Sequence, residues 1–82
     1  MESARKRILY RCSHRGMKEL DELLGNFTRQ HLDSISNQML VDFEALLDES
    51  DNDLFNWIIG NELGPQQFWP ILDKIRKYYG VL

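Results

Sequence analysis

The apolar residues of this chain recur every three or four positions, and this spacing constrains the fold more than any other feature. The clearest run is Met17, Leu20, Leu24, Phe27 and His31/Leu32. Such steps place side chains on one face of an α-helix, whereas a half-buried strand alternates with a period of two. No stretch of the sequence alternates in that way, and β-branched residues are few. We therefore predict an all-α protein.

Capping residues, glycines and prolines divide this pattern into about five helices. The first helix is expected at 3–13 with Ser3 as its cap, the second at 17–32 after Gly16, and the third at 36–48 with Ser36 as its cap. The fourth is expected at 54–59 after an acidic break, and the fifth at 65–79 from Pro65. Gly25 lies inside the second range, where it costs about 1 kcal/mol relative to alanine, so it either allows close helix packing or marks a bend. At 82 residues the chain has room for one domain. A single compact bundle covering residues 1–82 is predicted.

Charge is distributed unevenly along the chain. Residues 1–18 hold six Lys/Arg and one Glu, a net charge of +5, whereas residues 19–62 carry −10 and residues 63–82 carry +2. A nucleic-acid-binding protein would present a broader cationic surface, so we expect no nucleic-acid partner. No apolar run is long enough to cross a bilayer, and no signal-peptide core follows the basic N-terminus. The single Cys12 predicts a small, semi-buried side chain in a reducing compartment.

Catalytic and metal-binding signatures are missing from the sequence. Neither GxGxxG nor a GK[ST] phosphate loop occurs. His14 is expected on the surface and His31 partly buried, and neither has a second ligand at helical spacing. The acidic run 48–53 lacks the spacing and glycine of a calcium loop, so helix capping explains it better. We predict a protein that is not an enzyme and holds no metal.

The segment Arg15-Gly16-Met17-Lys18-Glu19 remains as the candidate working surface. Glycine at a helix start lets another backbone approach closely. Arg15 and Glu19 are four residues apart and could form a surface ion pair worth about 0–1 kcal/mol. Taken alone, this five-residue pattern is a weak signal of function, because chance or helix capping would explain it.

Two motifs together resemble those of a known family. Arg15-Gly16-x-x-Glu19, extended through residue 21, resembles the signature of the SdhE-type succinate dehydrogenase flavinylation factors. The segment 51–57, Asp-Asn-Asp-Leu-Phe-Asn-Trp, is similar to the family's acidic turn followed by Leu-Phe-x-Trp. Segments 23–25 and 31–34 also fit, and the resemblance covers about residues 5–79. His14 stands where many members carry an arginine.

The resemblance implies an FAD assembly factor with a chaperone-like role. Such a protein binds the flavoprotein subunit of succinate dehydrogenase, and possibly of fumarate reductase, and promotes covalent attachment of FAD to a histidine of that subunit. The partner's own histidine is the nucleophile, and the factor acts by positioning. The resemblance thus implies no tightly bound FAD, and we expect a monomer without membrane insertion. The bacterial cytoplasm is favoured over the mitochondrial matrix.

The same resemblance assigns roles to particular residues. Gly16 would admit close backbone approach, Arg15 would donate hydrogen bonds to the partner, and Glu19 would orient Arg15 or meet a basic group. The expected partner-binding set is Arg11, His14, Arg15, Gly16, Met17, Lys18 and Glu19. A secondary set, either interface or structural, is Asp53, Phe55 and Trp57. For Phe55 and Trp57 we favour the core.

Two other functions stay open from the sequence. The chain could be a flavin carrier that binds FAD itself, although the missing phosphate loop argues against tight binding. It could also be a small interaction module, such as a toxin-neutralising protein, because fold does not fix function. An FAD titration and a pull-down from native lysate would separate these alternatives.

Overall fold

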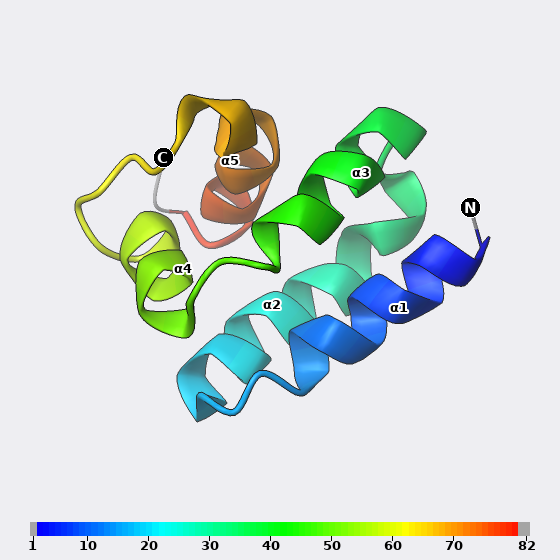
Figure 1. The fold of residues 1–82 in the computed structure, drawn as a ribbon, viewed down its shortest axis with the longest axis horizontal. Coiled ribbons are helices and arrows are strands. Elements are labelled where there is room, and N and C mark those ends of the chain that lie inside the picture. The colour runs from blue at the N-terminus through cyan, green and yellow to red at the C-terminus, as the bar shows by residue number, and fades with distance from the viewer. Residues whose placement is uncertain (1, 81–82) are drawn as a thin grey trace.

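The helical pattern folds into five α-helices and two short 3-10 helices. A computed structural model of the protein describes residues 2–80 (Figure 1). The 3-10 helices span Leu32–Ser34 and Gln66–Phe68, and the α-helices are α1 Glu2–Ser13, α2 Lys18–His31, α3 Asn37–Leu46, α4 Asp51–Ile58 and α5 Trp69–Tyr78. Residues 2–80 contain no strand. The prediction of an all-α bundle of about five helices is confirmed.

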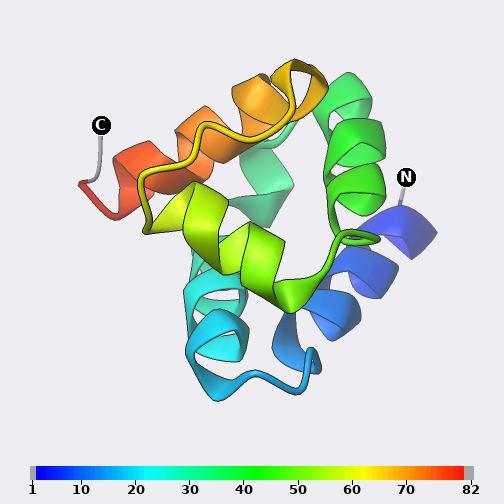
Figure 2. The ribbon, with the colours of Figure 1, turned by 60° about the vertical axis from the view of Figure 1, so that its left-hand side comes forward.

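The helices enclose one core. Helices α1 and α2 lie side by side, α3 runs alongside α1, and α4 and α5 pack against α2 (Figures 1 and 2). The Cα radius of gyration is 11.4 Å, close to the roughly 12 Å expected for a compact chain of this length. The largest fully buried side chains are Ile8, Leu20, Leu24, Phe27, Leu40, Phe43, Leu46, Leu47, Leu54, Ile58, Ile71 and Leu72. None of the helices within residues 2–80 is long and apolar enough to cross a membrane.

Helix boundaries differ from the prediction where a cap lies elsewhere. Ser3 lies inside α1, because the buried Ala4 extends the packed face toward the chain start. Ser36 does cap α3, and its Oγ accepts a hydrogen bond from the Met39 N–H at 3.2 Å. Helix α3 ends at Leu46. Helix α4 begins at residue 51, because Ser50 Oγ accepts a hydrogen bond from the N–H of residue 53 at 3.2 Å.

The last helix also begins later than expected. Pro65 precedes a 3-10 turn, and α5 starts at Trp69 with Pro70 in its first turn. The turn places Gly64 at a φ of +74°, against the ring of Trp57. Trp69 Nε1 donates to the Gly64 carbonyl at 3.0 Å, which fixes the loop before the helix.

Gly25 serves close packing inside α2. It is buried, and a Cβ built on it would lie 3.2 Å from an Arg29 guanidinium nitrogen and 3.5 Å from Ser13 Oγ. A larger side chain would therefore push against the end of α1. Of the two sequence alternatives, the structure supports close helix packing.

Candidate functional site

The loop 14–17 joins α1 to α2 and carries the first motif. Gly16 has a φ of +95°, in the left-handed region that favours glycine, and a Cβ built on it meets nothing within 4 Å. Gly16 is exposed, as are Lys18 and Glu19 in the first turn of α2. Met17 is half-buried and packs against the core. The exposed part of the motif is therefore a glycine backbone flanked by one cation and one anion.

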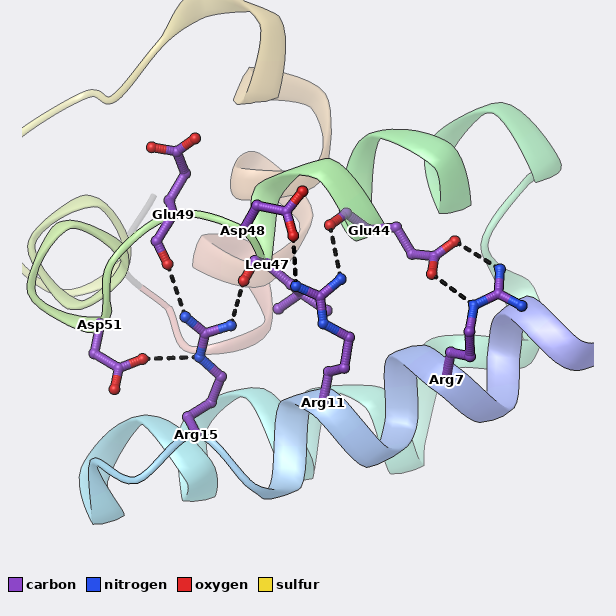
Figure 3. Close-up of polar contacts among 8 residues, drawn as sticks. All are labelled: Arg7, Arg11, Arg15, Glu44, Leu47, Asp48, Glu49 and Asp51. Carbon is purple, nitrogen blue, oxygen red and sulfur yellow. Dashed lines mark hydrogen bonds and ion pairs between the residues drawn. The ribbon is translucent and has the colours of Figure 1, made fainter.

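Arg15 turns inward, away from this exposed backbone. Its Nε donates to Asp51 at 2.8 Å, and its two terminal nitrogens donate to the carbonyls of Leu47 and Glu49, the latter at 2.7 Å (Figure 3). The side chain is only 12% exposed. No Arg15–Glu19 ion pair forms, so that expectation was wrong. Arg15 lies in the loop outside helical geometry, and its reach is toward the segment between α3 and α4.

The Arg15 ion pair joins the two sequence motifs in space. Asp51 is the first residue of the second motif, 36 positions along the chain from Arg15. On the other side of the loop, the Arg15 N–H donates to the carboxylate of Asp21 at 2.6 Å. The exposed loop is therefore tied at one residue to both α2 and the start of α4, which fixes the position of Gly16.

A row of arginines repeats this arrangement along α1. Arg7 forms two hydrogen bonds with the Glu44 carboxylate, at 2.9 and 3.0 Å. Arg11 donates to Asp48 at 2.7 Å and to the Glu44 carbonyl at 3.3 Å (Figure 3). The hydrogen bond from Arg7 lowers the pKa of the Glu44 carboxyl. Much of the basic N-terminal charge is thus paired with the acidic segment inside the molecule.

The remaining predicted residues are only partly available to a partner. Arg11 is half-buried by its contacts with α3. His14 is exposed, and its ring stacks on Tyr10 with centroids 4.1 Å apart. Tyr10 is 65% exposed and was missed in the sequence, although it precedes His14 by four residues, one helical turn. Together these residues extend the exposed surface along the end of α1.

The second motif separates into buried and open positions. Trp57 belongs to the core, whereas Phe55 is only half-buried, so the core assignment is confirmed for Trp57 and wrong for Phe55. Asp53 is half-buried, and its N–H completes the Ser50 cap. Phe55 instead lines a groove between α2 and α4, with a volume of about 410 Å³, that also contains Glu19. One sequence feature could have indicated this groove. Leu23 is apolar but lies beside the apolar stripe of α2, so its side chain is only partly buried.

Two further side chains of a reactive type, Cys12 and His31, lie outside the loop 14–17. Cys12 is fully buried, and burial raises its pKa to about 12, so the thiol is not poised as a nucleophile. His31 is exposed, contrary to prediction, and packs against the rings of Phe27 and Tyr78. Within residues 2–80, no group of three His, Cys, Asp or Glu residues is arranged to hold a metal ion.

Comparison with known proteins matches nearly the whole chain to one family. The model of a family described as flavinator of succinate dehydrogenase matches residues 6–79. A mitochondrial succinate dehydrogenase assembly factor 2 from Dictyostelium discoideum is 38% identical over 68 residues, which cover 83% of this chain and 48% of the relative. The FAD assembly factor SdhE of Legionella pneumophila (strain Paris) is 35% identical over 72 residues, covering 88% of this chain and 90% of the relative.

These relatives differ in length. A further mitochondrial assembly factor 2, from Meyerozyma guilliermondii, is 40% identical over 60 residues, 73% of this chain and 44% of the relative. The chain therefore spans about half the length of the mitochondrial relatives and most of the Legionella one. No solved structure matches the chain.

Proposed function

This chain belongs to the family described as flavinator of succinate dehydrogenase, and from that membership we propose that it is an FAD assembly factor for the flavoprotein subunit of succinate dehydrogenase. It binds that subunit and promotes covalent attachment of FAD to it. The observation that carries the proposal is the exposed Gly16 backbone on a loop that Arg15 ties to the second family motif. The flavoprotein of fumarate reductase is a further candidate partner.

The factor acts by positioning and contributes no reacting group. Gly16 presents backbone that a partner can approach closely, and Lys18 and Glu19 supply charges of both signs beside it. Arg15 serves as a positioning residue, because its donors hold the loop rather than reaching outward. Binding then stabilises the arrangement of the flavoprotein in which its histidine and FAD are aligned. A partner shifts such an equilibrium only by its differential affinity for the two arrangements.

FAD stays with the flavoprotein throughout this scheme, and the chain itself does not bind FAD tightly. A titration of FAD into the isolated protein at micromolar concentration is expected to give no saturable signal. A saturable signal would favour the flavin-carrier alternative. The bacterial cytoplasm and a monomeric state remain our expectations.

A matched pair of substitutions at Gly16 tests the proposal. Gly16→Ala and Gly16→Arg both place a side chain at a φ of +95°, which costs each about 1–2 kcal/mol of stability. The alanine adds only a Cβ in the open space where the partner would lie, whereas the arginine extends far into that space. We expect Gly16→Arg to abolish covalent flavinylation and Gly16→Ala to retain most of it. Each variant is co-expressed with the flavoprotein subunit, and covalent flavin is read by in-gel fluorescence.

The controls separate folding from binding. Circular dichroism at 222 nm should show both variants helical at the assay temperature. If Gly16→Arg, as the only copy, supports normal covalent flavin, the loop is not the contact surface. If the unmodified chain itself gives no increase over the flavoprotein alone, the proposed function is wrong.

A further inference from the structure

We propose that the groove between α2 and α4 receives an apolar side chain flanked by lysine or arginine on the flavoprotein subunit. This inference rests on the proposed function and adds a second contact, outside the first motif, with its own chemistry. The groove is lined by Leu23, Asn26, Phe55, Ile59 and Tyr79, together with the exposed Glu19 and Glu22, which we call its rim.

The floor of the groove is apolar and incompletely covered. Ile59 is 41% exposed at the C-cap of α4, and Phe55 lies one turn earlier, half-buried. Leu23 sits beside the buried stripe of α2, so it reaches only the edge of the core. Each of these side chains would lose further contact with water if a partner's apolar side chain entered. Removing apolar area from water contributes about 25 cal/mol per Å².

Tyr79, which lines the groove next to α5, is held in place without a partner. The Tyr79 hydroxyl donates a hydrogen bond to the Leu23 carbonyl of α2. A tyrosine hydroxyl with its ordinary pKa of 10.0 is already protonated at neutral pH and can donate, and burial raises the pKa of Tyr79 further, to about 12. Its ring therefore stays against α2. A preformed wall lowers the entropy that binding must overcome.

The residues that line the groove include two carboxylates and no cation. Glu19 and Glu22 are both exposed. The ion pairs found among residues 2–80 engage Glu44, Asp48, Asp51 and Asp73, and include neither glutamate. Arg29 hydrogen-bonds the lining residue Asn26 at 2.5 Å, so a cation borders the groove at the end farther along α2, whereas Glu19 and Glu22 lie toward the first motif. An apolar floor with two such carboxylates at its edge complements an apolar side chain between basic residues.

The groove is continuous with the predicted contact surface. Glu19 is both the last residue of the first motif and a rim residue of the groove. Helix α4 lies beside α2, so a partner seated on the loop 14–17 can also extend over the groove (Figure 2). The flavoprotein would then contact both family motifs, through Gly16 on one side and Phe55 on the other.

Two substitutions outside the first motif test the groove. Glu22→Lys reverses a rim charge, and Ile59→Ser removes apolar floor. Their matched controls are Glu62→Lys and Val41→Ser, which make comparable changes at exposed positions outside the groove. Affinity for the flavoprotein subunit is measured by isothermal titration calorimetry at low and moderate salt, after circular dichroism confirms the helical fold. We expect each groove variant to weaken binding about tenfold, a loss equivalent to about 1.4 kcal/mol, while the controls stay within about twofold.

The outcomes separate this inference from the proposed function. A weaker salt dependence of binding for Glu22→Lys than for the unmodified chain supports the charge complementarity. If the unmodified chain binds and promotes flavinylation but both groove variants bind equally well, the groove inference is overturned and the function stands. If the unmodified chain does not bind the flavoprotein, both fail. A dimer in sedimentation that Ile59→Ser dissociates would assign the groove to a second copy and also overturn the inference.

Discussion

Replacing Arg15 by alanine should destabilise the fold far more than replacing Arg7. Both arginines form an ion pair at 2.8–2.9 Å, but the Arg7 side chain is 57% exposed and the Arg15 side chain only 12%. An exposed ion pair contributes about 0–1 kcal/mol. Arg15 differs because it also donates to the carbonyls of Leu47 and Glu49.

The magnitude follows from these three contacts. Hydrogen bonds that involve a charged group contribute about 1.5–3 kcal/mol each. Water can reach part of the vacated space, since Asp51 is 29% exposed, so the full sum is not lost. We expect Arg15→Ala to lower the free energy of unfolding by about 2–4 kcal/mol, against about 0–1 kcal/mol for Arg7→Ala. Total stability for this length is about 4–12 kcal/mol, so the loss is a large share.

Urea unfolding followed by circular dichroism at 222 nm measures both variants. The midpoint should fall strongly for Arg15→Ala, and the thermal midpoint should fall by roughly 8–30 °C. Salt should weaken the Arg7 contribution more than the Arg15 contribution, because screening acts mainly on exposed pairs. An unfolding free energy for Arg15→Ala within about 0.5 kcal/mol of Arg7→Ala would refute the structural role. Loss of flavinylation in Arg15 variants should therefore be interpreted only alongside their stability.

Three further predictions concern other parts of the molecule. Gly64→Ala should lower the free energy of unfolding in urea by roughly 2–4 kcal/mol, because φ is +74° and the new Cβ would lie 3.0 Å from the Trp57 ring. Gly16→Ala has only the backbone cost, so equal losses for the two variants would contradict this prediction. Cys12, with its pKa raised by burial from 9.0 to about 12, should be alkylated by iodoacetamide roughly a thousandfold more slowly in the native protein than in urea, as mass spectrometry can follow. The pKa of Glu44 is lower in the folded protein than its unfolded value near 4.5. The Arg7–Glu44 pair therefore contributes to the free energy of unfolding above pH 4.5, and this contribution is lost as pH falls through the folded pKa. Glu44→Gln should therefore reduce the loss of stability as pH falls below about 4.5, and an unchanged pH profile would count against the pairing.

The helical class and most of the helix positions follow from local sequence patterns. Apolar spacing of three and four is a local property, and it is decided by which face of one helix can be buried. Ser36 and Gly16 were located correctly for the same reason, because a cap or a left-handed turn depends on a few neighbouring residues. The family motifs, too, could be recognised from linear order.

The tertiary structure decided what the charged residues contact. Arg15 is four residues from Glu19, and the spacing allowed an ion pair between them, yet the partner of Arg15 is Asp51, 36 positions away. No local rule gives this contact, because it depends on the segment between α3 and α4 lying beside the loop 14–17. The groove that contains Glu19 and Phe55 arises in the same way, from two helices that meet only in the folded protein. Local periodicity therefore fixed which segments are helices, and packing between distant segments fixed which side of the motif supports the fold and which side stays exposed.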